Sequence, residues 1–156
     1  MPERLNFRAR EIMDKDVLVL PRDCPVAEAV RLMAERHTSC AVVVEEDKPI
    51  GIVSERDLLP LAVRLDEGPP GPVLRRILSD EAHIFQFLKD IRKADAKVVA
   101  DVMSSPVECA DADATLGQLA AMMETDGYRQ LPIVQEGRLI GLVTRREILR
   151  ALADKT

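Results

Sequence analysis

The chain has 156 residues, of which 47% are hydrophobic and 31% charged, and its net charge is −5. This size predicts one domain of ordinary length, or two small halves that share a core. The composition and pattern argue against a membrane protein, because no apolar run reaches the roughly 20 residues of a span and the N-terminus has no signal-peptide segment.

The cysteines and the charge narrow the class of protein further. Cys24, Cys40 and Cys109 are odd in number and lack CxxC spacing, so neither a disulfide framework nor a zinc site is indicated. A reduced, cytoplasmic protein is the simplest interpretation. The acidic balance argues against a general electrostatic grip on nucleic acid.

The first elements along the chain form a readable pattern. Residues 17–20 are an apolar, β-branched run closed by a proline, which predicts a short strand. Residues 25–36 carry an i, i+3, i+4 apolar stripe behind a proline, which predicts a helix. Residues 40–44 and 49–53 flank a polar turn and predict a buried β-hairpin.

The hairpin runs into a motif with chemical content. Gly51 lies in the strand, and Ser54, Arg56 and Asp57 follow where the strand passes into a helix-like pattern. Backbone N–H groups at a helix start and a hydroxyl suit a phosphate, Arg offers a forked cation, and a carboxylate accepts from ribose hydroxyls. The motif is therefore suited to a phosphorylated ribose. Helix capping by Ser54 and Asp57 is the rival interpretation.

The middle of the chain differs from both ends. Residues 67–72 are rich in Gly and Pro and must break the preceding helix. Apolar positions between 73 and 91 then indicate one or two amphipathic helices. We expect a helical linker over residues 67–100, which either lies on its own domain or makes a dimer contact.

The second half repeats the first after a shift of ninety residues. Met13 falls on Met103, Gly51 on Gly141, and Ser54 on Thr144. Residues 115–125 repeat the helix, and 131–134 with 139–143 repeat the hairpin. We therefore predict an α/β (α+β) fold of two β-α-β-β-α repeats, at 11–66 and 101–152, related by a pseudo-twofold axis.

The repeated residues carry a family resemblance. Val102-Met103-Ser104, residues 128–134 and residues 139–144 resemble the motifs of a tandem pair of CBS domains, the module named after cystathionine beta-synthase. The likeness covers about residues 11–59 and 101–150. It implies a regulatory module that binds AMP, ADP, ATP or S-adenosylmethionine in clefts between the repeats. It also implies a disc-like homodimer. Because the 156 residues hold no fused effector domain, we expect the signal to pass to a separate effector protein.

The resemblance assigns roles to particular residues. Ser54 is expected to contact phosphate, Asp57 to hold ribose, and Arg56 to assist at the phosphate. The second copy offers Thr144 and Arg146 with Glu147, in the place where the family prefers Asp, so we expect the first site to bind better. The base is expected near residues just before the second strand and near the first strand of a repeat: Thr38, Ser39, Cys40, Val17, Leu18, Tyr128, Arg129, Gln130, Met103 and Val107.

Two other functions compete with a nucleotide sensor. A CBS-fold dimerisation scaffold without a ligand predicts a stable dimer that ignores adenine nucleotides. A regulator whose partner is nucleic acid is disfavoured by the acidic balance and by the lack of a helix-turn-helix segment. Catalysis is not expected, because no catalytic triad, HExxH, phosphate-binding loop or dinucleotide fingerprint is present. We expect no catalytic cofactor and no metal.

Overall fold

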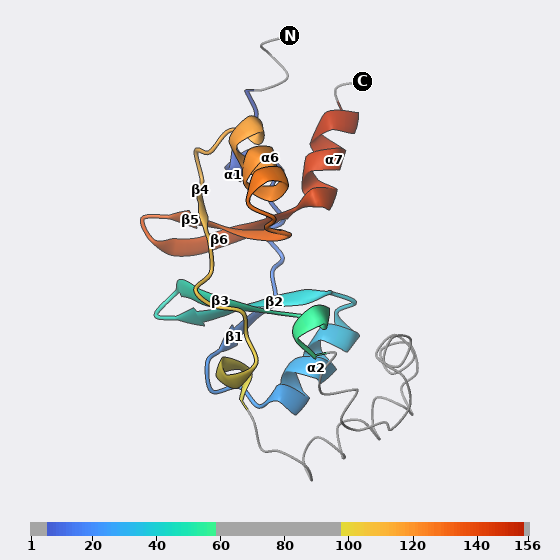
Figure 1. Cartoon of the computed structure of the whole chain (residues 1–156), viewed down its shortest axis with the longest axis vertical. Coiled ribbons are helices and arrows are strands. Elements are labelled where there is room, and N and C mark those ends of the chain that lie inside the picture. Colours follow the sequence, from blue (N-terminus) through green and yellow to red (C-terminus); the bar gives the residue numbers. More distant parts are fainter. Residues whose placement is uncertain (1–5, 59–97, 155–156) are drawn as a thin grey trace. The chain divides into compact units, whose positions relative to one another are not determined.

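The computed structural model describes residues 6–58 and 98–154 (Figure 1). The chain divides into two compact units. The first-sheet unit consists of the described residues within Leu18–Glu45 and Ile50–Pro106. The second-sheet unit consists of those within Met1–Val17, Glu46–Pro49 and Val107–Thr156. Most of the predicted linker, residues 67–97, lies outside the described residues, as does the predicted helix beyond residue 58.

The first-sheet unit has strand order β1-β2-β3. β1 (Val19–Pro21) runs parallel to β2 (Cys40–Glu45), and β3 (Lys48–Ser54) lies on the other side of β2. The helix α2 (Val26–Glu35) connects β1 to β2, as parallel pairing requires. β1 differs from the predicted strand 17–20 because it includes Pro21, which an edge strand tolerates. Residues 55–58 are helical.

The predicted apolar stripe of α2 forms the core of this unit. Val30 and Met33 are 0% and 1% exposed. They pack with Val43 and Val53 from the sheet and with Leu58 after β3. Burying side chains of this size stabilises a fold by about 1.5–3 kcal/mol each, so the stripe accounts for the position of α2 on the sheet.

The second-sheet unit repeats the topology. β4 (Ala110–Asp111) is parallel to β5 (Gln130–Gln135), and β5 is antiparallel to β6 (Arg138–Thr144). α6 (Leu116–Thr125) joins β4 to β5, and α7 (Arg145–Ala153) follows β6. Figure 1 shows both helices on one face of the sheet. The predicted α+β class and the β-α-β-β-α order are confirmed, whereas the pseudo-twofold axis and the repeat boundaries stay predictions.

Two short segments pack in the unit formed by the other repeat, which the order of the repeats along the chain did not predict. The helix α1 (Ala9–Ile12) belongs to the second-sheet unit, where Ala9 donates to the carbonyl of Ala114 at 2.8 Å. The 3₁₀ turn η2 (Val99–Asp101) belongs to the first-sheet unit, where Val99 donates to the carbonyl of Cys24 at 2.8 Å. We call residues 9–14 and 99–104 the leading segments. Each lies at the start of one repeat in sequence and packs on the sheet of the other.

Each leading segment ends beside the strand that leads into a motif, which is β3 for the first motif and β6 for the second. Asp14 exchanges two backbone hydrogen bonds with Leu142 of β6, both of 2.9 Å. Ser104 exchanges two with Ile52 of β3, of 2.8 and 3.1 Å. Because positions 14 and 104 are equivalent under the ninety-residue shift, both motifs have the same kind of neighbour.

Candidate functional site

The first motif joins two hydroxyls to one carboxylate. Asp57 Oδ2 accepts hydrogen bonds from the backbone N–H and the Oγ of Ser54, at 2.8 and 3.1 Å. Asp57 Oδ1 accepts from Ser104 Oγ at 2.8 Å. Asp57 and Ser54 are half-buried and Ser104 is exposed. The helix-capping contact proposed for Ser54 and Asp57 is therefore present, and Oδ1 still faces an accessible hydroxyl.

Residues predicted for the base lie in the same unit as this motif. The backbone N–H of Glu55 donates to the carbonyl of Ser39 at 3.0 Å, which joins the start of β2 to the end of β3. Thr38 Oγ1 donates to the carbonyl of Cys40 at 3.1 Å. Cys40 is 4% exposed, and its role at a base stays a prediction. Leu18 is likewise buried.

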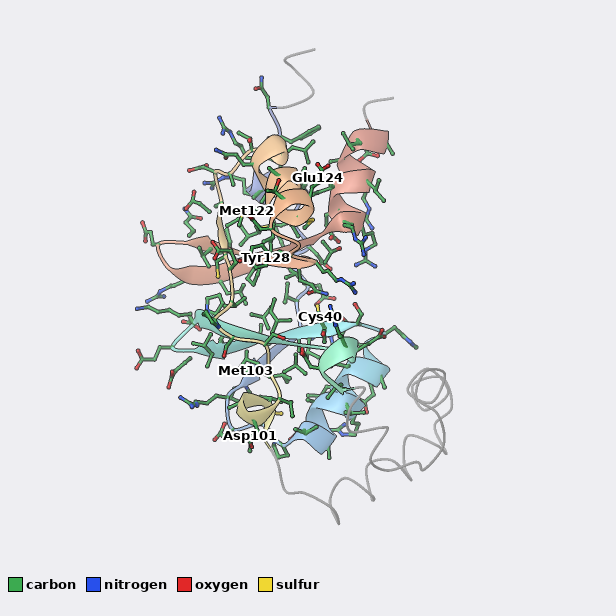
Figure 2. All side chains as sticks on the ribbon, in the orientation of Figure 1. Cys40, Asp101, Met103, Met122, Glu124 and Tyr128 are labelled. Atoms are coloured by element: carbon green, nitrogen blue, oxygen red, sulfur yellow. The ribbon has the colours of Figure 1, made fainter. Side chains whose placement is uncertain are left out.

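Arg56 and Met103 also belong to the first-sheet unit. Arg56 is exposed, and its guanidinium is the kind of group that binds an anion. Met103, which Figure 2 labels just after η2, lies on the backbone of Gly51. A Cβ at Gly51 would stand 2.5 Å from Met103 Sδ, so this glycine permits close packing of the leading segment.

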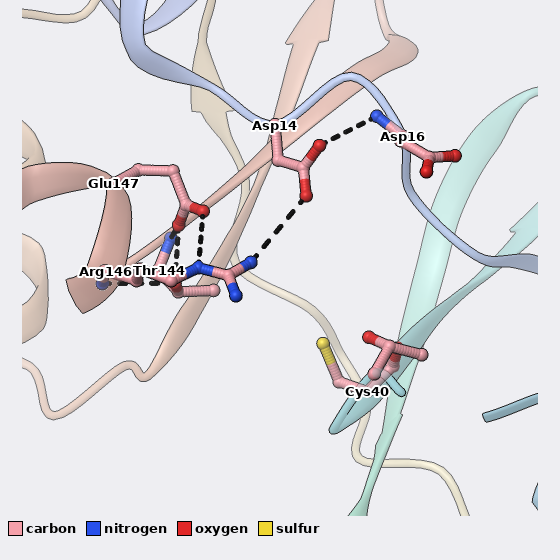
Figure 3. A network of polar contacts seen from close by, with 7 residues as sticks. Asp14, Asp16, Cys40, Thr144, Arg146 and Glu147 are labelled. Carbon is pink, nitrogen blue, oxygen red and sulfur yellow. Dashed lines mark hydrogen bonds and ion pairs between the residues drawn. The ribbon is translucent and has the colours of Figure 1, made fainter. Parts of the chain in front are cut away.

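The second motif is held more tightly by the protein itself. Glu147 Oε2 accepts from the backbone N–H of Thr144 at 2.7 Å and from Thr144 Oγ1. Glu147 Oε1 lies 3.4 Å from Arg146 Nε, and Arg146 Nη2 lies 3.9 Å from Asp14 Oδ2 (Figure 3). Asp14 Oδ1 accepts from the backbone N–H of Asp16 at 2.9 Å. A chain of polar contacts thus runs from the cap of α7 to the leading segment.

Glu147 stands out because it is a carboxylate that is only 2% exposed. Burial by itself would raise the pKa of Glu147, but hydrogen bonds from the side chain and backbone of Thr144, with the charge of Arg146, outweigh it and lower the pKa. Glu147 is therefore an ionised carboxylate with its oxygens directed at protein donors.

The other predicted site residues also belong to the second-sheet unit. Gln130 begins β5 and is the register partner of Thr144 at the end of β6. Tyr128 and Arg129 lie in the connection from α6 to β5 and are exposed. Val107 and Val17 are half-buried. The structure therefore places Gln130 beside the motif and leaves Tyr128 accessible, while the binding roles of these residues stay predictions.

Sequence reasoning missed two residues that contact the motifs. Ser104 and Asp14 each follow a matched methionine, Met103 or Met13. The ninety-residue alignment places them at one position, where a hydroxyl in one copy replaces a carboxylate in the other. This difference between the two copies was visible in the sequence. Only the packing of the leading segments shows that these two residues contact the motifs.

Metal ligation and membrane insertion have no structural counterpart in residues 6–58 and 98–154. No group of three or more His, Cys, Asp or Glu side chains there could hold a metal ion. Within the same ranges, no helix combines the length and the apolar character that a bilayer span needs.

The repeated fold and motifs agree with a known family. The model of the CBS domain matches residues 9–63 and again residues 99–154. The chain belongs to the CBS-domain family, as a tandem pair. Its sequence is 30% identical over 161 residues to the uncharacterized protein MJ1426 of Methanocaldococcus jannaschii, in a match that covers 96% of both chains.

Solved structures show the same fold. CBSX2 in complex with AMP has a TM-score of 0.70 and 24% identity, over 96% of this chain and 98% of that one. The CBS domain pair of MJ0100, in complex with 5-methylthioadenosine and S-adenosyl-L-methionine, has a TM-score of 0.66 and 17% identity, over 96% of this chain and 98% of that one. The resemblance to CBS pairs predicted from the sequence is confirmed.

Proposed function

We propose that this CBS pair is a regulatory module that binds an adenosine-containing ligand of the AMP, ADP, ATP or S-adenosylmethionine class. The observation that carries the proposal is the half-buried Asp57 carboxylate, held between the hydroxyls of Ser54 and Ser104. Complexes of structurally similar pairs with AMP and with S-adenosyl-L-methionine support it.

The roles of the first motif follow from its chemistry. An ionised carboxylate has about four acceptor positions, and Asp57 uses three in the contacts described, so it can accept from a ribose hydroxyl. The exposed Arg56 supplies the positive charge for a phosphate. Ser39, whose carbonyl accepts from the N–H of Glu55, and the neighbouring Thr38 are the polar groups that we assign to an adenine. Phosphate affinity that depends on an exposed arginine weakens as salt increases.

The output of such a module is a shift between conformations. A ligand that binds one conformation of the chain more tightly than another raises the population of the conformation it prefers. The size of the shift is set by the difference between its affinities for the two conformations. We propose that this shift is read by a separate effector protein, that the chain acts as a cytoplasmic homodimer, and that it has no catalytic activity of its own.

The alternative is a CBS-fold scaffold that binds no ligand, and one observation favours it. The contacts of Thr144 with Glu147 are those of a capping box, and Ser54 with Asp57 makes the same kind of contact. Capping alone therefore accounts for these motif residues. The two functions differ in their response to nucleotide.

Thermal melting against AMP, ADP, ATP and S-adenosylmethionine tests the proposal. A ligand at a hundred times its Kd stabilises a fold by about 2.7 kcal/mol. We expect at least one of these compounds to raise the midpoint, and Asp57→Asn to remove most of the increase while keeping an acceptor for the Ser54 N–H.

The matched control is Glu45→Gln, which removes an exposed carboxylate of the same unit that lies 3.8 Å from Arg22 and outside the motif. It should leave the ligand response unchanged. Absence of any increase with the wild-type chain would reject ligand binding of this class and favour the scaffold.

A further inference from the structure

The two motifs differ most at the residue that the leading segment presents to them. Position 104 offers a hydroxyl to the first motif, and the equivalent position 14 offers a carboxylate to the second. Both are fixed by the same pair of backbone hydrogen bonds to the motif strand. The difference therefore lies in the side chains and not in the backbone around them.

In the first motif, the hydroxyl and the carboxylate form a pair of neighbouring acceptors. Ser104 Oγ donates its only proton to Asp57 Oδ1 over 2.8 Å. A hydroxyl oxygen that has donated its proton keeps two acceptor positions, and a carboxylate oxygen accepts more than one hydrogen bond. Two acceptors at this spacing, one exposed and one half-buried, match two adjacent donors such as the 2′- and 3′-hydroxyls of a ribose.

In the second motif no such pair is presented by the residues that the structure describes. Glu147 is 2% exposed, so a ligand hydroxyl does not reach its carboxylate without displacing the cap of α7. Asp14 is engaged by the backbone of Asp16 and lies opposite Arg146, which also contacts Glu147. The second motif therefore has two carboxylates on either side of the Arg146 guanidinium. The first motif instead has the neutral hydroxyl of Ser104 beside the accessible carboxylate of Asp57.

Resting on the proposed function, we propose that Ser104 with Asp57 forms a diol-recognition pair, and that Asp14 with Glu147 denies the second motif such a pair. Ser104 is then a residue that determines specificity. It selects a ligand that carries both ribose hydroxyls over a deoxyribose counterpart. The chain takes one adenosine ribonucleotide, at the first motif.

Calorimetric titration with AMP and, separately, with S-adenosylmethionine tests the number of sites. We expect one ligand per chain for whichever compound binds. Two sites of equal affinity would overturn the inference while leaving the proposed function intact. No binding of either compound, together with no thermal response to ADP or ATP, would overturn the proposed function and the inference with it.

The role of Ser104 is tested by the ratio of affinities for a ribonucleotide and its 2′-deoxy counterpart. Ser104→Ala should weaken the ribonucleotide by up to about tenfold, the effect of losing one neutral hydrogen bond from a ribose hydroxyl, and should change the deoxynucleotide much less. Ser104→Thr keeps the hydroxyl and should retain the wild-type ratio. An equal loss for both nucleotides in Ser104→Ala would show a merely structural role and overturn the assignment.

A gain of function tests the second motif. The double variant Asp14→Ser with Glu147→Asp gives the second motif the serine and the aspartate that form the pair in the first, and we expect it to bind two ligands per chain. Retained binding at the first motif shows that the variant is folded. A folded double variant that still binds one ligand would overturn the role given to Asp14 and Glu147.

Discussion

Met103 covers the backbone of Gly51 so closely that no larger residue fits there without movement. A Cβ on Gly51 would lie 2.5 Å from Met103 Sδ, 3.0 Å from its Cγ and 3.1 Å from the carbonyl of Ser104. The second copy has the same relationship, because a Cβ on Gly141 would lie 2.7 Å from Met13 Cγ. The glycine of each motif is therefore required by the leading segment that packs on it.

The first prediction concerns this contact. Gly51→Ala should lower the free energy of unfolding by about 1–3 kcal/mol, because overpacking displaces Met103 and the segment that carries Ser104. Urea denaturation measures the change. Gly117→Ala is the control, since a Cβ at this exposed position of α6 meets nothing nearer than 4.0 Å. It should stabilise the chain by up to about 1 kcal/mol through helix propensity, and an equal loss in both variants would contradict the packing argument.

The second prediction separates the compact units from the sequence repeats. Met13→Ala should destabilise the second-sheet unit by about 1–2 kcal/mol, because Met13 packs on the core around Leu119 and Leu131 although it lies at the start of the first repeat. Hydrogen exchange should show lost protection in β5 and β6. Met103→Ala is the counterpart and should affect β2 and β3. The reverse pattern would disprove the exchange of leading segments.

The third prediction follows from the lowered pKa of Glu147. A carboxyl whose pKa is lower in the folded state contributes stability that is present above its ordinary value of 4.5. That contribution is lost as the pH falls through the lowered value. Glu147→Gln should therefore cost about 1–3 kcal/mol at pH 7 and progressively less as the solution is acidified below pH about 4. Thermal midpoints of both chains between pH 7 and pH 3 measure the convergence, and a constant difference would contradict it.

The fourth prediction concerns the two hairpin turns. Glu46 and Asp47 have φ of 52° and 66°, whereas the second turn places Gly137 at φ 80° beside Glu136 at 54°. Positive φ at both central residues is typical of a type I′ turn, in which glycine is favoured at the second position. Asp47→Gly should stabilise the chain by up to about 1 kcal/mol, and Gly137→Ala should destabilise it by about 1–2 kcal/mol. Chemical denaturation of the two variants measures both signs, and stabilisation by Gly137→Ala would contradict the argument.

Local sequence predicted most of the fold. The apolar stripe around Met33 and the run at Ala41–Val43 have helix and strand periodicities that do not depend on the rest of the chain. The ninety-residue shift that places Gly51 on Gly141 then predicted one topology twice. α1 and η2 were missed, because segments of four and three residues are too short to show a period.

The sequence by itself determined that the chain has two copies of one fold, each with a glycine, a hydroxyl and a carboxylate at the same corner. Only the tertiary structure decided which leading segment meets which motif. Each motif has a glycine and each leading segment has a methionine. Local sequence patterns therefore do not indicate which leading segment packs on which motif. It also decided that Asp57 stays accessible beside Ser104 while Glu147 is buried under its own cap. Burial and hydrogen bonding depend on neighbours that are distant in sequence, and those neighbours are set only when the chain has packed.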